Sequence, residues 1–194
     1  EIRKTDNLTI KDSTFSNNDY GIWSEYQPSD GDSYGQITDT YITSNTFSNN
    51  TNAIDLIMNQ ADFNNLNIDN NTIKNNSTGI DFGGGGYGPR VRCAYFKNNI
   101  IDNNTLGVNL NRIYGTGSNT VLTYPVVFSN NYVINNDNAL YLEYSPSVKI
   151  KIINNIFKTN GNGIEFVGSP SSSNHLIINN YFSANGKHVY INGS

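Results

Sequence analysis

Short apolar segments separated by asparagine-rich turns recur along the whole chain. One apolar residue in each segment serves as an anchor, and successive anchors lie 24 to 32 residues apart. The seven anchors are Phe15, Phe47, Ile73, Ile101, Val133, Phe157 and Phe182. Self-similarity at a period of roughly 20 to 50 residues is typical of proteins built from stacked repeats. The chain is therefore predicted to contain about seven stacked units.

Positions around each anchor carry the same residue type in unit after unit. The third residue after the anchor is always asparagine: Asn18, Asn50, Asn76, Asn104, Asn136, Asn160 and Asn185. The second residue before it is serine once and then always asparagine: Ser13, Asn45, Asn71, Asn99, Asn131, Asn155 and Asn180. Apolar residues elsewhere in the unit alternate with period two, which predicts short strands.

Three short strands joined by tight turns cannot bury an apolar face unless one unit stacks on the next. Stacking brings equivalent residues into line about 4.8 Å apart. Inward asparagines then form a ladder in which each amide bonds its neighbours above and below, and this satisfies polar groups that would otherwise be unfavourable to bury. The spacing of an amphipathic helix and the leucine scaffold of a leucine-rich repeat are both missing. The predicted fold is all-β, a single-stranded parallel β-helix of about seven coils, forming one domain over residues 1–194.

Composition narrows the function. Only 14% of the residues are charged and the net charge is −4. Nucleic-acid binding needs clustered lysine and arginine, which this chain lacks. No apolar run approaches the roughly 20 residues that span a bilayer. The single cysteine, Cys93, excludes an internal disulfide.

From Leu8 to Ile191 the repeat resembles the right-handed parallel β-helices of the pectate-lyase-like superfamily. That resemblance implies an extracellular or cell-surface protein that handles a uronate-containing polysaccharide in a groove along one outer sheet. It does not imply one activity, because the motifs of pectate lyases, polygalacturonases and alginate epimerases are absent. Coils start close to both ends of the sequence without a capping helix. We therefore expect a longer protein, or other domains or subunits that cover the ends.

The third strand of each unit supplies an outward column of acids and aromatics. It contains Trp23, Asp55, Asp81, Asn109, Tyr141, Glu165 and Tyr190, and Glu143 lies in the next outward column. Long variable segments follow this strand after the first, third and fourth coils. Loops held by a rigid scaffold often carry function. We expect a groove here, although an outward aspartate on a sheet is most often just a solvated surface residue.

Asp55 and Asp81 form the sharpest candidate site, because adjacent coils place their carboxyls roughly 5 Å apart. Such a pair suits a retaining glycosidase. It could equally bind Ca²⁺, and in a lyase Ca²⁺ would neutralise the uronate carboxylate while Arg90 or Arg92 acted as base or clamp. The predicted catalytic residues are Asp55, Asp81, Arg90 and Glu165, with Asp55 and Asp81 as calcium candidates. The predicted substrate-binding residues are Trp23, Arg92, Asn109, Arg112, Tyr114, Tyr141 and Glu143.

The leading hypothesis is a lyase or glycoside hydrolase acting on an acidic polysaccharide. A non-catalytic carbohydrate-binding module is supported by the aromatic side chains and by the missing motifs. A structural piece of a tailspike or cell-surface protein is the third alternative.

Overall fold

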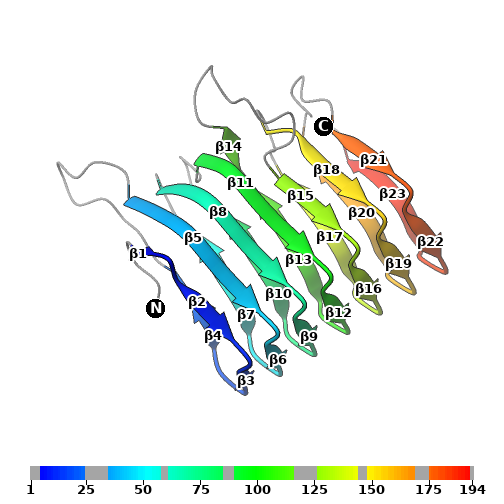
Figure 1. Ribbon diagram of the computed structural model, residues 1–194. Helices are drawn as coiled ribbons and strands as arrows, with labels where there is room; N and C mark the ends of the chain where they lie inside the picture. The colour runs from blue at the N-terminus through cyan, green and yellow to red at the C-terminus, as the bar shows by residue number, and fades with distance from the viewer. Residues whose placement is uncertain are drawn as a thin grey trace.

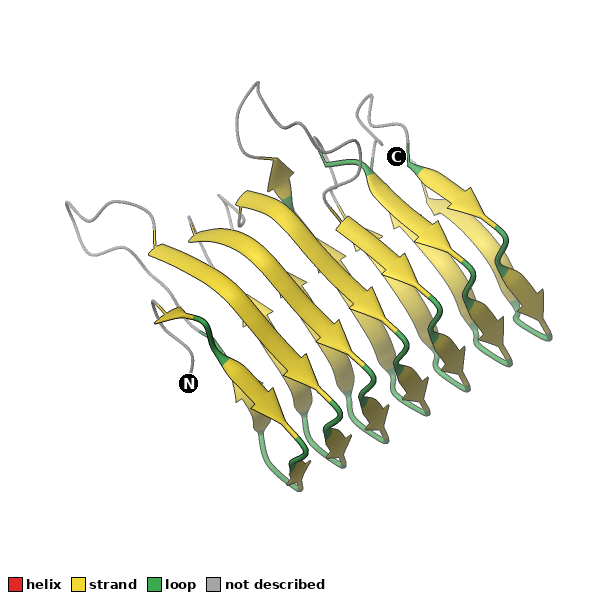
Figure 2. Ribbon diagram, viewed as in Figure 1, coloured by secondary structure: helices red, strands yellow, loops and turns green. Residues whose placement is uncertain are grey.

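The computed structural model describes residues 5–24, 35–57, 61–84, 90–115, 126–143, 148–168 and 175–192. Every element in these ranges is a β-strand, and the strands stack side by side from the N-terminal to the C-terminal coil (Figure 1; Figure 2). All recorded pairings are parallel. The predicted all-β parallel helix is confirmed.

Three sheets form the walls of the helix. The first sheet follows the path β1 (Thr5–Asp6), β5 (Gly35–Thr43), β8 (Ala61–Asp69), β11 (Arg90–Lys97), β15 (Val126–Ser129), β18 (Ile150–Ile153) and β21 (Leu176–Ile178), with β2 (Thr9–Lys11) paired to β5 and β14 (Tyr114–Gly115) paired to β11. The second sheet contains β3 (Thr14–Ser16), β6 (Thr46–Ser48), β9 (Thr72–Lys74), β12 (Ile100–Asp102), β16 (Tyr132–Ile134), β19 (Ile156–Lys158) and β22 (Tyr181–Ser183). The third sheet contains β4 (Tyr20–Trp23), β7 (Asn52–Ile57), β10 (Thr78–Gly83), β13 (Leu106–Asn111), β17 (Asn138–Glu143), β20 (Asn162–Val167) and β23 (Lys187–Asn192).

The number of complete coils is slightly smaller than the seven anchors suggest. The second and third sheets each have seven strands. Only the five inner strands of each sheet have a neighbour on both sides. The protein is therefore better described as five fully stacked turns with an edge coil at each end.

Two asparagine corners join the three sheets, and each residue of an Asn-Asn pair has a different task. The first residue of the pair adopts a left-handed conformation, as at Asn75 (φ 59°) and Asn103 (φ 53°). Asparagine tolerates this region better than most residues do. The second residue turns inward and builds the ladder. The repeated Asn-Asn pairs are thus explained by one bend and one buried amide at each corner.

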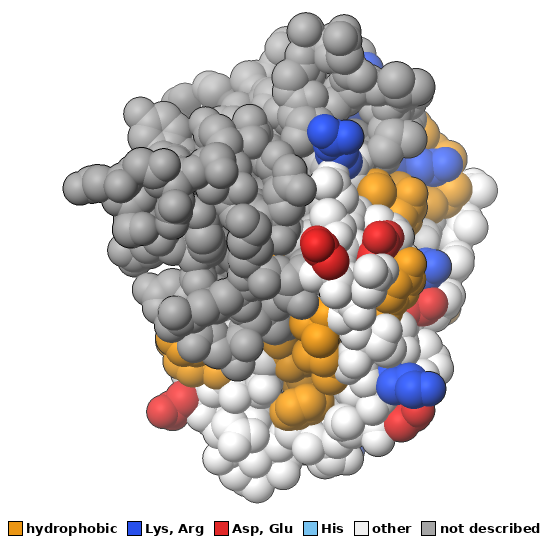
Figure 3. All heavy atoms as spheres, turned by 60° about the vertical axis from the view of Figure 1, so that its left-hand side comes forward, with side chains coloured by type: hydrophobic (Ala, Val, Ile, Leu, Met, Phe, Trp, Pro, Cys, Tyr) orange, Lys and Arg blue, Asp and Glu red, His pale blue; other side chains and the backbone are white. Residues whose placement is uncertain are grey.

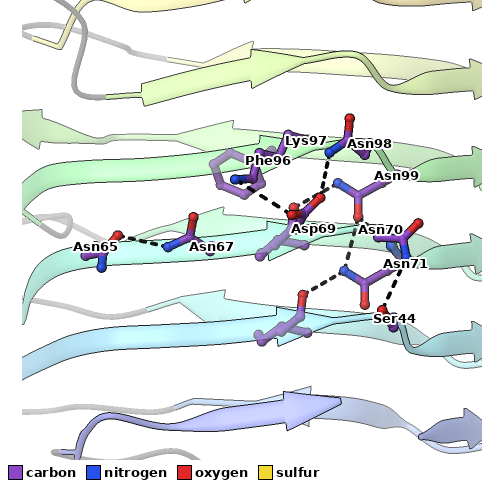
Figure 4. Close-up of polar contacts among 12 residues, drawn as sticks. Ser44, Asn65, Asn67, Asp69, Asn70, Asn71, Phe96, Lys97, Asn98 and Asn99 are labelled. Atoms are coloured by element: carbon purple, nitrogen blue, oxygen red, sulfur yellow. Dashed lines mark hydrogen bonds and ion pairs between the residues drawn. The ribbon is translucent and has the colours of Figure 1, made fainter. Parts of the chain in front are cut away.

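Both predicted ladders are present. The Nδ2 of Asn104 donates to the Oδ1 of Asn136 at 3.0 Å and to the backbone oxygen of Ile73 at 3.3 Å. Its own Oδ1 accepts from the Nδ2 and the backbone N–H of Asn76, both at 2.9 Å. Figure 4 shows the same arrangement in the other ladder, where Asn71 and Asn99 lie on adjacent coils. Each amide therefore contacts the coil on either side.

Aliphatic and phenyl side chains fill the interior. Phe47, Phe82, Phe96 and Phe157 are completely buried. Rings also stack along the axis, as between Phe15 and Phe47, whose centroids lie 5.0 Å apart. Because the interior is fully used by packing, side chains available for chemistry lie on the outer faces.

Candidate functional site

The outward column of the third sheet, Trp23, Asp55, Asp81, Asn109, Tyr141, Glu165 and Tyr190, is a true column. Each of these residues is the register partner of the next along the sheet. Parallel strands lie about 4.8 Å apart, so Asp55 and Asp81 are immediate neighbours. The predicted placement of Asp55 and Asp81 on adjacent strands is confirmed.

Asp55 is held firmly and is only 5% exposed. One carboxylate oxygen accepts a hydrogen bond from the side chain of Asn52 at 2.8 Å, and the other accepts from the backbone N–H of Ile57 at 3.3 Å. Burial raises the pKa of Asp55, although these two hydrogen bonds oppose the rise. An outward aspartate was expected to be well solvated, whereas this one is largely shielded.

The pKa of the Asp81 carboxyl is strongly raised. Burial raises its pKa from 3.8 to about 6, and the negative charge of Asp55 adds to the rise. A hydrogen bond from the Nδ2 of Asn109 to its Oδ1, at 2.9 Å, acts in the opposite direction. Asp81 thus changes charge near neutral pH beside a second carboxyl, which is a common property of catalytic acids.

Amide oxygens extend this polar cluster onto the next coil. The Oδ1 atoms of Asn109 and Asn111 are buried and have no hydrogen-bond partner. Asn111 pairs in register with Gly83, two residues beyond Asp81. A side chain at Gly83 would not fit, because its Cβ would lie 2.1 Å from the backbone oxygen of Asn111. Two buried acceptors without donors on the strand next to Asp81 favour a bound cation or donor group at this point.

Glu165 and Glu143 form a separate acidic region. Glu165 lies three strands away from Asp81 along the sheet, and Asn109 and Tyr141 occupy the two strands between them. At about 4.8 Å per strand the separation is roughly 14 Å. Glu165 is 8% exposed and accepts from the side chain of Asn162 at 3.0 Å. It is therefore too far from Asp81 to share one bond-breaking step with it.

The predicted aromatic contacts lie at both ends of the column and within it. Trp23 is half-buried and stacks on Tyr20 with centroids 5.7 Å apart. Tyr141 is half-buried in the middle of the sheet. At the other end, the Nζ of Lys187 lies 3.4 Å from the centroid of the Tyr190 ring, so a cation covers that ring.

The predicted basic residues and Tyr114 lie near the ends of their strands. Arg92 is exposed where β11 shifts register against β8. Arg112 follows β13 and has a left-handed backbone. Its backbone N–H donates to the backbone oxygen of Glu143. Arg90 and Tyr114 face each other as backbone partners. Their side chains, and the Gly-rich segment before Arg90, lie outside the described residues.

Sequence reasoning missed the asparagines that hold the acids. Asn52 and Asn162 each stand three residues before a carboxylate on the same strand and donate to it. That spacing, Asn-x-x-Asp or Asn-x-x-Glu, was the available signal. Nothing in the sequence shows that the side-chain oxygen of Asn111 is buried.

A family model described as a right-handed β-helix region matches residues 1–96, just under half of the chain. The described residues form a parallel β-helix, and this fold agrees with that match. The pectate-lyase-like superfamily is consistent with both the match and the three parallel sheets. No curated protein and no solved structure gives a significant match to the chain. The β-helix fold is consistent with polysaccharide-related or surface functions and does not specify an activity.

Three further observations concern surface charge, metal ligands and membrane-spanning helices. In the described part of the chain, acidic and basic side chains are interspersed on the face shown in Figure 3, without one large patch of a single sign. No three His, Cys, Asp or Glu side chains among the described residues come together as a metal site. The described ranges also contain no helix that is long and apolar enough to cross a membrane.

Proposed function

We propose that the outward column of the third sheet binds and cleaves an extracellular, uronate-containing polysaccharide, with Asp81 as the proton donor in glycoside hydrolysis. The supporting observation is the pairing of Asp81 with Asp55 on adjacent strands, together with a pKa of about 6 for Asp81. A neutral carboxyl next to an ionised one is the arrangement that glycosidases use.

The chemistry follows from the two environments. Protonated Asp81 donates its proton to the glycosidic oxygen as the bond from that oxygen to the anomeric carbon breaks. Asp55 is oriented by Asn52 and Ile57 and faces the positive charge that develops on the sugar. Carboxyls at roughly 5 Å suit a retaining mechanism, in which the second carboxylate forms a glycosyl ester that water then hydrolyses.

Calcium-assisted lysis is the second candidate. It is favoured by the unpartnered Oδ1 atoms of Asn109 and Asn111 beside Asp81. Ca²⁺ prefers six to eight oxygen ligands, and Asp81, together with Asp55 on one side or Asn109 and Asn111 on the other, would supply a part of that set. When bound, Ca²⁺ would neutralise the uronate carboxylate and make the adjacent C–H more acidic. Arg90 or Arg92 would act as the base or hold the carboxylate.

A panel of acidic polysaccharides tests the proposal, with wild type and Asp81→Asn compared in the presence of Ca²⁺ and of a chelator. Hydrolysis produces reducing ends without ultraviolet absorbance. In Asp81→Asn, the rate at which these ends form should fall at least about a hundredfold. Lysis produces absorbance from a new sugar double bond and requires Ca²⁺.

Asp137→Asn serves as the matched control, because Asp137 is an exposed aspartate at the turn before the third sheet. Equal turnover by wild type and Asp81→Asn would reject the site. Retained glycan binding without turnover would identify a non-catalytic carbohydrate-binding module instead, with Trp23 and Tyr141 as the contacts to test.

A further inference from the structure

A stripe of exposed apolar side chains runs along the outside of the second sheet, away from the acidic column. Its members are Ile100, Tyr132, Ile156 and Tyr181, which are 45%, 37%, 37% and 59% exposed. Each is the register partner of the next. The first three coils carry threonine at the same position, at Thr14, Thr46 and Thr72. The apolar stripe is therefore confined to the last four coils.

The stripe is flat and accessible. Its strands are three residues long and keep an uninterrupted register. Tight left-handed corners bound these strands on both sides, as at Asn130 and Asn135 around β16. In the chain order, the long variable segments connect strands of the third sheet to strands of the first sheet. The stripe is therefore a linear surface along the helix axis.

The two tyrosines repeat at every second coil. Since adjacent parallel strands lie about 4.8 Å apart, the Tyr132 and Tyr181 rings repeat at about 10 Å. That distance is comparable to the length of one disaccharide in an extended β-1,4-linked chain. Tyrosine combines a rigid apolar ring with a polar hydroxyl, and sugar rings present apolar C–H faces that stack on such rings. The isoleucines between the tyrosines keep the strip continuous.

The column beside the stripe is mostly polar and carries no net charge. The neighbouring outward column contains Asp102, Ile134, Lys158 and Ser183. The Nδ2 of Asn135 donates to the Oδ1 of Asp102 at 2.8 Å. One acid and one base balance each other along the column, and both offer hydrogen-bonding groups to sugar hydroxyls. A neutral glycan fits this surface better than an acidic one.

The width of the stripe argues against a protein partner. A stable protein interface buries about 800 Å² on each partner. A single column of four partly exposed side chains is far smaller, although it matches a polymer that is one sugar wide. We propose that Ile100, Tyr132, Ile156 and Tyr181 form a second glycan-binding surface, which docks a neutral, ribbon-like β-1,4-linked polysaccharide.

Depletion of the full chain by insoluble cellulose and by insoluble chitin tests this surface. Wild type binds at least one of the two, and Tyr132→Ala or Tyr181→Ala weakens that binding about tenfold. The double variant loses binding. Tyr132→Phe keeps the ring and therefore binds as wild type does, which separates stacking from hydrogen bonding by the hydroxyl.

Tyr41→Ala is the matched control, because Tyr41 is also 37% exposed but lies on the first sheet. Equal loss in Tyr41→Ala and Tyr132→Ala, or no binding of either polymer by wild type, overturns the proposal. Sedimentation velocity supplies a second test. If wild type self-associates and Tyr132→Ala dissociates it, a second copy of the chain covers the stripe and the glycan assignment is wrong.

This surface does not depend on the proposed hydrolysis. Asp81→Asn leaves binding to cellulose or chitin unchanged while it stops turnover of acidic polysaccharide. Conversely, Tyr132→Ala leaves turnover of a soluble acidic substrate unchanged. The two proposals can therefore fail separately.

Discussion

The asparagine ladders and the Asp55–Asp81 pair are both columns of identical polar side chains stacked at the strand spacing, yet their energetics are opposite. An amide has donors and an acceptor, so Asn76, Asn104 and Asn136 satisfy one another through the stack. An ionised carboxylate only accepts, so two of them on adjacent strands repel. The raised pKa of Asp81 records that repulsion together with burial.

This difference separates residues that build the fold from residues that the fold carries. Stacked asparagines stabilise the helix and recur in nearly every coil. The aspartate pair is unfavourable at neutral pH and occurs once. A surface position that is held at a cost in stability is a candidate for function.

The largest effect is expected when an acid is put into the ladder. Asn104→Asp removes the Nδ2 donor to Asn136 and buries a charge, since Asn104 is buried within the stack. We expect a loss of about 3–5 kcal/mol in the free energy of unfolding at pH 7, measured by chemical denaturation. Asn103→Asp is the control, because Asn103 is exposed and sits in the left-handed bend that aspartate tolerates. Similar losses in both variants would contradict the account of the ladder.

Replacing an aspartate by asparagine in the acidic pair should stabilise the protein. Asp81→Asn removes the repulsion from Asp55 and the burial of a charge, so the unfolding free energy at pH 7 should rise by about 1–3 kcal/mol. Enzymatic turnover should be lost in the same variant. Calorimetry and the polysaccharide assay measure the two effects, with Asp137→Asn, at an exposed turn, as the unchanged control. A variant that is less stable than wild type would show that Asp81 supports the fold.

The stability difference between wild type and Asp81→Asn should also depend on pH. Because folding raises the pKa of Asp81 from 3.8 to about 6, the folded wild type keeps its proton in this interval while the unfolded chain loses it. The destabilisation by Asp81 is therefore absent below about pH 4, grows between pH 4 and 6, and is complete above about pH 6. Unfolding curves of both proteins from pH 4 to 8 measure this. A stability difference that stays constant with pH would argue against a raised pKa of Asp81.

The smallest effect concerns the end of the ladder. Asn185 accepts from Asn160 and donates to the backbone oxygen of Phe157, but it is only half-buried in the last coil. Asn185→Ala should reduce stability by about 1 kcal/mol, and Asn104→Ala by about 2–4 kcal/mol. Equal losses at the two positions would mean that support from both neighbouring coils adds nothing.

Most of the fold could be predicted, because stacking forces one residue type to repeat at each inward position. The anchors, both ladders and the full outward column of the third sheet follow from that register. The coil count was slightly high, because an anchor marks an edge coil as clearly as a fully stacked one. Periodicity cannot report that neighbours cover Asp55, or that Asn52 and Asn162 reach back to acids on their own strands. These features depend on tertiary packing.

The site was predictable only as a column. Register places Asp81 beside Asp55 and moves Glu165 three strands away, which the spacing along the chain already implied. The shift in the pKa of Asp81 and the unpartnered oxygens of Asn109 and Asn111 depend on burial, which side-chain pattern alone does not give. The apolar stripe on the second sheet was not singled out from sequence, although isoleucine and tyrosine at outward positions were the signal.

Asp55 and Asp81 are expected to form a coupled pair in which Asp81 keeps its proton up to about pH 6. Carbon NMR titration of protein labelled at the aspartate carboxyls measures this directly, and the Asp81→Asn variant assigns the signal. The account predicts that Asp81 titrates at about 6 in wild type and at lower pH in Asp55→Asn. A midpoint near 4 in wild type, or one that does not move in Asp55→Asn, would contradict it.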